Sequence, residues 1–103
     1  MYIGLLEDEA QLAQHVCELL ESAGHTVNVF INGEDMVKAV GRDTIDLYVL
    51  DWRVPRISGL DVLKHIRDTR ALKEPVLFLT SRTDEQDIIE ALNAGADDYC
   101  TWH

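Results

Sequence analysis

The 103-residue sequence has few basic residues, few cysteines and no long apolar run. Nine Lys and Arg stand against 19 Asp and Glu, which gives a net charge of −10 with His neutral. Such a surface repels phosphates, so we expect no direct binding to nucleic acid or to an anionic membrane. Scattered carboxylates can also serve solubility alone. The apolar run 3–6 is too short to span a bilayer and ends at Glu7, so no membrane segment is expected.

The two cysteines are too few for a disulfide-stapled secreted scaffold. Cys17 and Cys100 also lack partners at metal-ligand spacing, so we interpret them as buried thiols in a reducing compartment, which indicates the cytoplasm. Apolar residues make up 47% of the chain, enough for a hydrophobic core and too many for a disordered acidic tail. The length suits one domain over residues 1–103.

Short apolar runs alternate with stretches of helical period. We expect strands at 3–6, 27–30, 45–50, 76–79 and 99–102. The expected helices lie at 12–23, at 33–40, after a cap at Ser58, and after a capping box formed by Thr83 and Gln86. Apolar strands separated by helices are typical of parallel sheets with both faces covered. The pattern therefore predicts one α/β domain of four strand–helix units and a final strand.

Acidic side chains follow two of the expected strands. Glu7 and Asp8 come after the first strand, and Asp51 follows the third. Acidic residues at strand ends are often only solvated loop starts, but parallel strands bring their carboxyl ends to one edge, where these three would converge. Such a cluster is unfavourable without a cation, and hard oxygen ligands suit Mg²⁺. The residues after the first strand are acidic rather than glycine-rich, so a phosphate would reach this edge only through the metal.

Five motifs, in this order, resemble the receiver domain of two-component response regulators. Glu7-Asp8 resembles the family's acidic pair, and the run 51–59 resembles its phosphoacceptor loop. Thr80 matches the hydroxyl position after the fourth strand, and the run 95–99 ends at the switch aromatic, Tyr99. The resemblance covers essentially the whole chain and implies a flavodoxin-like, doubly wound, parallel five-stranded sheet.

The resemblance also implies roles for individual residues. Asp51 would be the phosphoacceptor, taking a phosphoryl group from a phosphohistidine on a sensor histidine kinase in a Mg²⁺-dependent reaction. Thr80 would then donate its hydroxyl to the phosphoryl group, and Tyr99 would turn inward as the switch. The implied metal ligands are Asp8 and Asp51 directly, Glu7 through water, and the backbone carbonyl of Arg53. The chain would be a regulatory domain, not a turnover enzyme, with at most self-phosphorylation and self-dephosphorylation, and it would control transcription through an output domain outside this chain.

The sequence departs from the family pattern after Tyr99. The family has a lysine three residues later, followed by proline, whereas this chain has Trp102 and His103. An indole cannot supply the lysine's charge, so phosphoryl stabilisation should weaken. The alternative reading is therefore a receiver-shaped protein-interaction module that is not productively phosphorylated.

The fifth helix of the family is also missing, which gives a (βα)5 fold without its last helix. One sheet face would then keep only its first helix, leaving apolar side chains of the first and last strands open to water. This arrangement favours a piece of a longer regulator over a homodimer or domain-swapped oligomer that covers the face.

Two enzyme classes on the same layered fold fit less well. A flavin carrier needs a hydroxyl- and glycine-rich loop where this chain has three acids in a row, at 7–9. An aspartate-nucleophile phosphatase normally presents two aspartates one residue apart after its first strand, and only Asp8 is found there. Trp52, directly after Asp51, is interpreted as a rim residue whose fluorescence would report metal binding.

Overall fold

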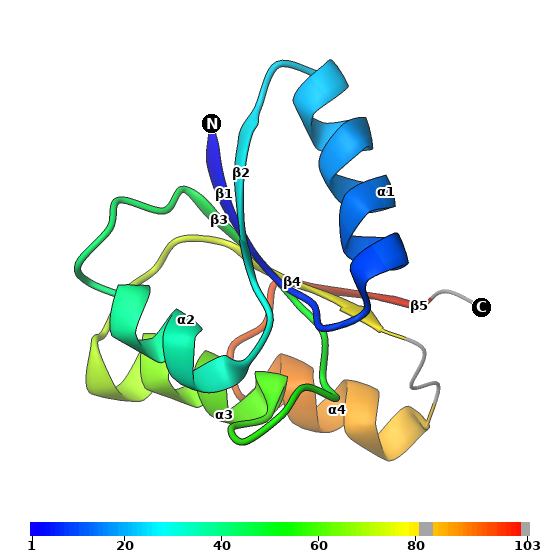
Figure 1. Cartoon of the computed structure of the whole chain (residues 1–103). Helices are drawn as coiled ribbons and strands as arrows, with labels where there is room; N and C mark the ends of the chain where they lie inside the picture. Colours follow the sequence, from blue (N-terminus) through cyan, green and yellow to red (C-terminus); the bar gives the residue numbers. More distant parts are fainter. Residues whose placement is uncertain (81–83, 102–103) are drawn as a thin grey trace.

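The computed structural model describes residues 1–80 and 84–101. Its five strands are β1 (Tyr2–Leu6), β2 (Thr26–Phe30), β3 (Leu47–Leu50), β4 (Val76–Thr80) and β5 (Asp98–Thr101). They form one parallel sheet in the order β2-β1-β3-β4-β5 (Figure 1). The strand order reverses between β1 and β3, so the doubly wound, flavodoxin-like α/β fold expected from the sequence is confirmed.

The helices are α1 (Ala10–Ser22), α2 (Gly33–Ala39), α3 (Gly59–Lys64), the π-helical turn η1 (His65–Thr69) and α4 (Glu85–Asn93). Side-chain caps explain three of the starts. Asn32 accepts a hydrogen bond from Asp35 N, and Ser58 accepts one from Asp61 N. Asp84 caps α4 by accepting from Gln86 N, whereas the expected cap residue, Thr83, lies outside the described residues.

The helix after β3 differs from the expected regular helix. Its last turn widens to π-helical geometry at η1, where Arg70 N donates to His65 O at 3.0 Å. The Arg67 side chain, within this turn, donates to three backbone carbonyls of the neighbouring connections. These bonds hold the widened turn against the loop before β4, a tertiary effect that hydrophobic periodicity cannot predict.

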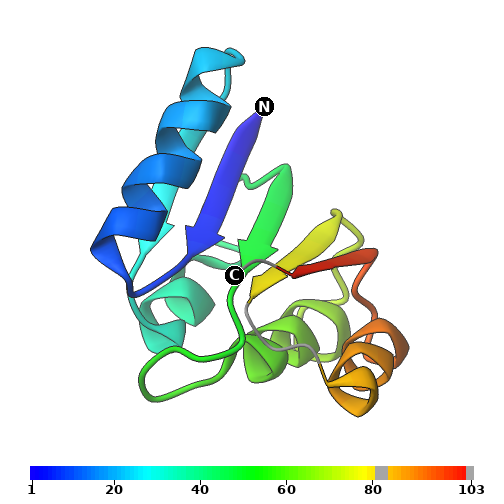
Figure 2. The same cartoon turned by 90° about the vertical axis from the view of Figure 1, so that its right-hand side faces the viewer.

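The two faces of the sheet are covered by different numbers of helices. The helices α2, α3 and α4 cover one face of the sheet, whereas α1 covers the other face (Figures 1 and 2). The larger hydrophobic cluster, which includes Leu50, Trp52 and Phe78, is called the main core. The first strand is not open to water as expected, because α1 covers Ile3 and Leu5, which are only 1% and 2% exposed. On the face covered by α1, exposure to water is found at β5, as expected, and extends to β4, since Cys100 is exposed and Leu79 is half-buried. The expectation of a buried Cys100 was therefore wrong.

None of the helices within the described ranges has the length and apolar character needed to cross a membrane. The expected fifth-strand position Trp102 and the following His103 lie outside the described residues, and β5 ends at Thr101.

Candidate functional site at the carboxyl end of the sheet

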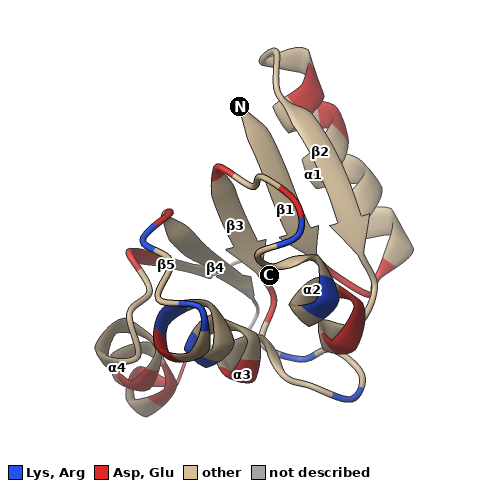
Figure 3. Ribbon diagram, turned by 90° about the vertical axis from the view of Figure 1, so that its left-hand side faces the viewer, with Lys and Arg blue, Asp and Glu red and all other residues tan. Residues whose placement is uncertain are grey.

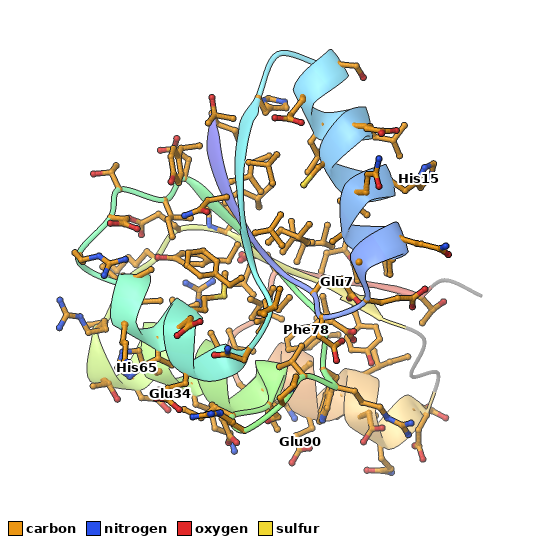
Figure 4. The ribbon with its side chains drawn as sticks, viewed as in Figure 1. Glu7, His15, Glu34, His65, Phe78 and Glu90 are labelled. Atoms are coloured by element: carbon orange, nitrogen blue, oxygen red, sulfur yellow. The ribbon has the colours of Figure 1, made fainter. Side chains whose placement is uncertain are left out.

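The carboxyl ends of β1 and β3 lie side by side, with Leu6 opposite Leu50 in register. The backbone holds the residues that follow in place: Asp51 N donates to Leu6 O at 3.0 Å, and Glu7 N donates to Phe30 O at 2.9 Å. Figure 4 labels Glu7 where β1 runs into α1. Ordinary sheet pairing, extended by one residue, thus brings acidic side chains from two connections to the same place.

Three carboxylates gather at this edge, as the sequence predicts. One oxygen each of Glu7, Asp8 and Asp51 lies within 4.8 Å of the others. Their environments differ, because Glu7 is 3% exposed, Asp51 is half-buried and Asp8 is exposed. The cluster therefore ranges from a buried carboxyl, Glu7, to an exposed one, Asp8, with Asp51 intermediate in exposure.

The buried carboxyl is strongly perturbed. Burial is the main factor that raises the pKa of Glu7 to about 8, and the hydrogen bond with Asp51 adds to the increase. The negative charges of Asp51 and Asp8 raise the pKa of Glu7 further. The backbone N–H of Glu9 donates to Glu7 Oε1 at 3.1 Å, which acts in the opposite direction. A carboxyl held in this way favours either a proton or a metal ion beside it.

The donor set fits Mg²⁺. All three side chains offer hard oxygen ligands, and among the residues that the structure describes no imidazole or thiolate joins the cluster. The desolvated Glu7 gains most from a cation, since its charged form is disfavoured by burial and by two like charges. The hydrogen bond between Arg53 N and Asp51 Oδ1 is long, at 3.4 Å, so the loop does not neutralise Asp51 strongly. The role of the Arg53 carbonyl as a further ligand stays a prediction.

The loop after β3 closes tightly on its own start. Gly59 N donates to Trp52 O at 3.0 Å, and Gly59 packs so closely against the Asp51 carbonyl that a Cβ there would overlap it. Only glycine fits this approach without moving the backbone. The spacing of Gly59 from Asp51, noted in the sequence, thus has a steric cause.

The same loop is fastened to α2, which the sequence did not reveal. The Arg56 guanidinium donates to Glu34 Oε2 at 2.8 Å, although Arg56 adopts a left-handed φ of 72°. Gly33 lies against the Ile57 carbonyl so closely that a Cβ would overlap it. Figure 3 shows the basic residues of this loop near the acidic end of the sheet. Opposite charges at positions 34 and 56 were the available signal, but their separation in sequence hid the pairing.

Trp52 is a core residue, and the expectation of a rim position was wrong. It is 8% exposed, and its ring centroid lies 5.7 Å from that of Phe78. The ring of Tyr99, the expected switch aromatic, stacks on that of Phe78, with the two centroids 5.6 Å apart. Thr80 is the last residue of β4, in register with Thr101 of β5.

Comparisons with known proteins agree with this architecture. Residues 3–101 match the model of the response regulator receiver domain family. The transcriptional regulatory protein DltR of Streptococcus agalactiae is 36% identical over 101 residues, covering 98% of this chain and 45% of that protein. The two-component response regulator PhoP of Pseudomonas aeruginosa is 38% identical over 99 residues, covering 96% of this chain and 44% of that protein.

A solved structure, TrrA of Thermotoga maritima in complex with Mg²⁺-BeF, is similar with a TM-score of 0.88 and 27% identity, covering 99% of this chain and 86% of that one. The chain spans less than half the length of the two curated relatives named above. With its sequence match, its sheet order and its acidic edge in agreement, the chain belongs to the response regulator receiver domain family.

Proposed function

We propose that this chain accepts a phosphoryl group on Asp51 in a Mg²⁺-dependent reaction. The observation that carries the proposal is the cluster of Glu7, Asp8 and Asp51, whose carboxylate oxygens lie within 4.8 Å of one another. Asp51 is half-buried, so its carboxylate is partly desolvated and partly exposed to solvent, which suits a nucleophile. The likeness to a receiver solved with Mg²⁺-BeF supports the same reading.

The chemistry needs only displacement at phosphorus. An oxygen of Asp51 attacks the phosphorus of a phosphohistidine, the new O–P bond forms, and the P–N bond to the imidazole breaks. Bound Mg²⁺ supplies charge neutralisation for the phosphoryl oxygens. Asp8 and Asp51 would hold the ion directly, Glu7 would act through water, and the Arg53 carbonyl would be a further ligand. Thr80 then contacts the phosphoryl group, and Tyr99 responds as the switch.

Membership of the family supports a proposal for the partner and the output. Receiver domains of two-component systems interact with sensor histidine kinases, and we propose such a kinase as the phosphodonor, in the cytoplasm. The relative DltR is a transcriptional regulatory protein, so we propose an output of that kind through a domain outside this chain. The chain itself acts as a phosphoacceptor and regulatory domain, not as a turnover enzyme.

Labelling by a small phosphodonor tests the proposal. Acetyl phosphate with Mg²⁺ is expected to add one phosphoryl group, visible by intact-protein mass spectrometry, and chelation of Mg²⁺ is expected to prevent it. Asp51→Asn should abolish the labelling. Asp68→Asn removes an exposed aspartate outside the cluster and should label like the parent. Undiminished labelling of the Asp51→Asn protein would refute the assignment.

The alternative function is a receiver-shaped interaction module that is not productively phosphorylated. Trp102 favours it, because the family has a lysine at this position. Titration with Mg²⁺ and then with beryllofluoride, followed by tryptophan emission, separates the two. A response to both ligands supports the working phosphoacceptor. A response to Mg²⁺ alone supports a receiver that binds the metal but does not stabilise a phosphoryl group, because the lysine is replaced. No response to either ligand supports the pure interaction module.

A further inference from the structure

Phe78 touches three parts of the candidate site. Its ring is fully buried, its centroid lies 5.7 Å from that of Trp52 with a 45° tilt, and it stacks on Tyr99 at 5.6 Å and 19°. The loop after β3 meets the same ring, because a Cβ on Gly59 would lie 3.2 Å from Phe78 Cε1. One apolar side chain thus contacts the residue after the acceptor, the end of the acceptor loop and the switch position.

The positions of these rings are set by the sheet. Phe78 lies opposite Leu50 of β3 and opposite Tyr99 of β5 in register, so it separates β3, which Asp51 follows directly, from β5, which carries Tyr99. Trp52 and Phe78 belong to the main core, and Tyr99 packs against it (Figure 4 labels Phe78). A rotation of Tyr99 therefore cannot occur without changing the packing on one face of Phe78.

A close-packed chain of rings transmits such a change. Each aromatic pair contributes enough to alter an equilibrium constant by about 2- to 10-fold beyond its burial. Uncovering one face of Phe78 would leave a void, and a partial relaxation of the core into it would move the ring or its other neighbour. That other neighbour is Trp52, whose backbone directly follows Asp51.

We propose that Phe78 is a positioning residue that couples the occupancy of the Asp51 site to the position of Tyr99 through the contacts Trp52–Phe78–Tyr99. This inference rests on the proposed function, in which Asp51 takes the phosphoryl group. The route is separate from the hydroxyl of Thr80, because it runs through ring packing in the core. Thermodynamic reciprocity then applies: the factor by which a ligand at Asp51 shifts the equilibrium between positions of Tyr99 equals the factor by which the position of Tyr99 changes the ligand affinity.

The first test needs no ligand. In a Trp102→Phe background, Trp52 is the only tryptophan, so its indole N–H resonance and its emission report one site. Tyr99→Leu is expected to shift both signals when Phe78 is present and to leave them nearly unchanged in a Phe78→Leu background. Equal shifts in both backgrounds, or no shift in either, would overturn the inference. Phe78→Met, whose flexible unbranched side chain fills irregular space without a ring, replaces Phe78→Leu if the latter does not fold.

The second test measures reciprocity with beryllofluoride and Mg²⁺ as the probe. Tyr99→Leu is expected to change the apparent Kd for beryllofluoride by about 2- to 10-fold with Phe78 present, and by less than about 1.5-fold in the Phe78→Leu background. Equal changes in both backgrounds would contradict the role of Phe78. If the parent binds no beryllofluoride, the proposed function fails, and the ligand-free comparison still decides whether the rings are coupled.

The matched control is Tyr48→Leu. Tyr48 is also buried in the main core, but it lies opposite Val76 at the start of β4, away from the acidic edge. Removing this aromatic side chain should lower stability and leave the effect of Tyr99→Leu on the beryllofluoride Kd intact. Loss of the effect in the Tyr48→Leu background would show that general core loosening, and not the contact through Phe78, carries the coupling.

Discussion

The two ends of the parallel sheet each contain a buried ionisable side chain, but the partners of the two side chains are opposite in kind. At the amino end, the largely buried Arg67 side chain donates to the carbonyls of Gly95, Leu72 and Glu74, and pairs with Asp97 at 2.9 Å. At the carboxyl end, the buried Glu7 lies beside two further carboxylates, Asp8 and Asp51. The Arg67 charge is compensated and stabilises the fold, whereas the negative charge of Glu7 is unfavourable in the fold until a bound cation compensates it.

Breaking the amino end should have the largest effect on stability. Arg67→Met removes the guanidinium donors to three backbone carbonyls and leaves Asp97 without its guanidinium partner, so we expect the free energy of unfolding to fall by about 2 to 4 kcal/mol. Chemical denaturation measures this change. Lys64→Met, at an exposed position of the same helical segment, should change stability little. Equal losses in the two variants would show that the Arg67 network is not a stabilising centre.

The carboxyl end should give the metal-free protein a stability that falls as pH rises. The folded pKa of Glu7 is about 8 against an ordinary value of 4.5. Below the lower value the carboxyl is protonated in both states, and its contribution to stability is fully present. As pH rises toward 8, the unfolded chain loses the proton first, so the folded state is progressively disfavoured, by about 1 to 3 kcal/mol.

The control for this pH dependence is Glu7→Gln. An amide cannot ionise, so the variant should show a flatter decline in Tm between about pH 4.5 and 8 than the parent, measured without divalent metal. A parent whose Tm does not decline across this window, or a variant that declines as steeply, would show that Glu7 is not held in a protonated state by its surroundings.

The ion pair that joins the loop after β3 to α2 should have the smallest effect on stability. Arg56→Ala removes an ion pair between side chains that are 68% and 40% exposed, which contributes about 0 to 1 kcal/mol. Lys38→Ala is the matched control, because Lys38 contacts the same Glu34 at 3.6 Å without touching the loop. We expect the Mg²⁺ affinity to fall by about 2- to 5-fold in Arg56→Ala and to stay unchanged in Lys38→Ala. Equal affinities in both would show that the ion pair does not position the loop.

The features that the sequence predicted are those set by local pattern. Strand–helix alternation predicted the sheet, and strand ends predicted that Glu7, Asp8 and Asp51 would meet. The features it missed depend on contacts between distant segments. Trp52 looked like a loop residue because its neighbours are polar, but the loop turns its indole into the core against Phe78.

Long-range contacts also explain the other differences. The pairing of Glu34 with Arg56 joins residues far apart in sequence, and the widened turn at η1 accompanies the bonds of Arg67 to the chain before β4 and β5. Periodicity contains no information about such partners. The placement of β1 beneath α1, which buries Ile3, likewise follows from three-dimensional packing.

The most direct test of the central claim is the Tm of the parent and of Asp8→Asn, measured with and without Mg²⁺ at matched ionic strength. The carboxylate cluster predicts that Mg²⁺ raises the Tm of the parent, since it relieves repulsion among Glu7, Asp8 and Asp51. Asp8→Asn should raise the metal-free Tm and remove the response to Mg²⁺. A metal-free Tm that falls in Asp8→Asn, with Mg²⁺ still bound and still stabilising, would contradict the shared site.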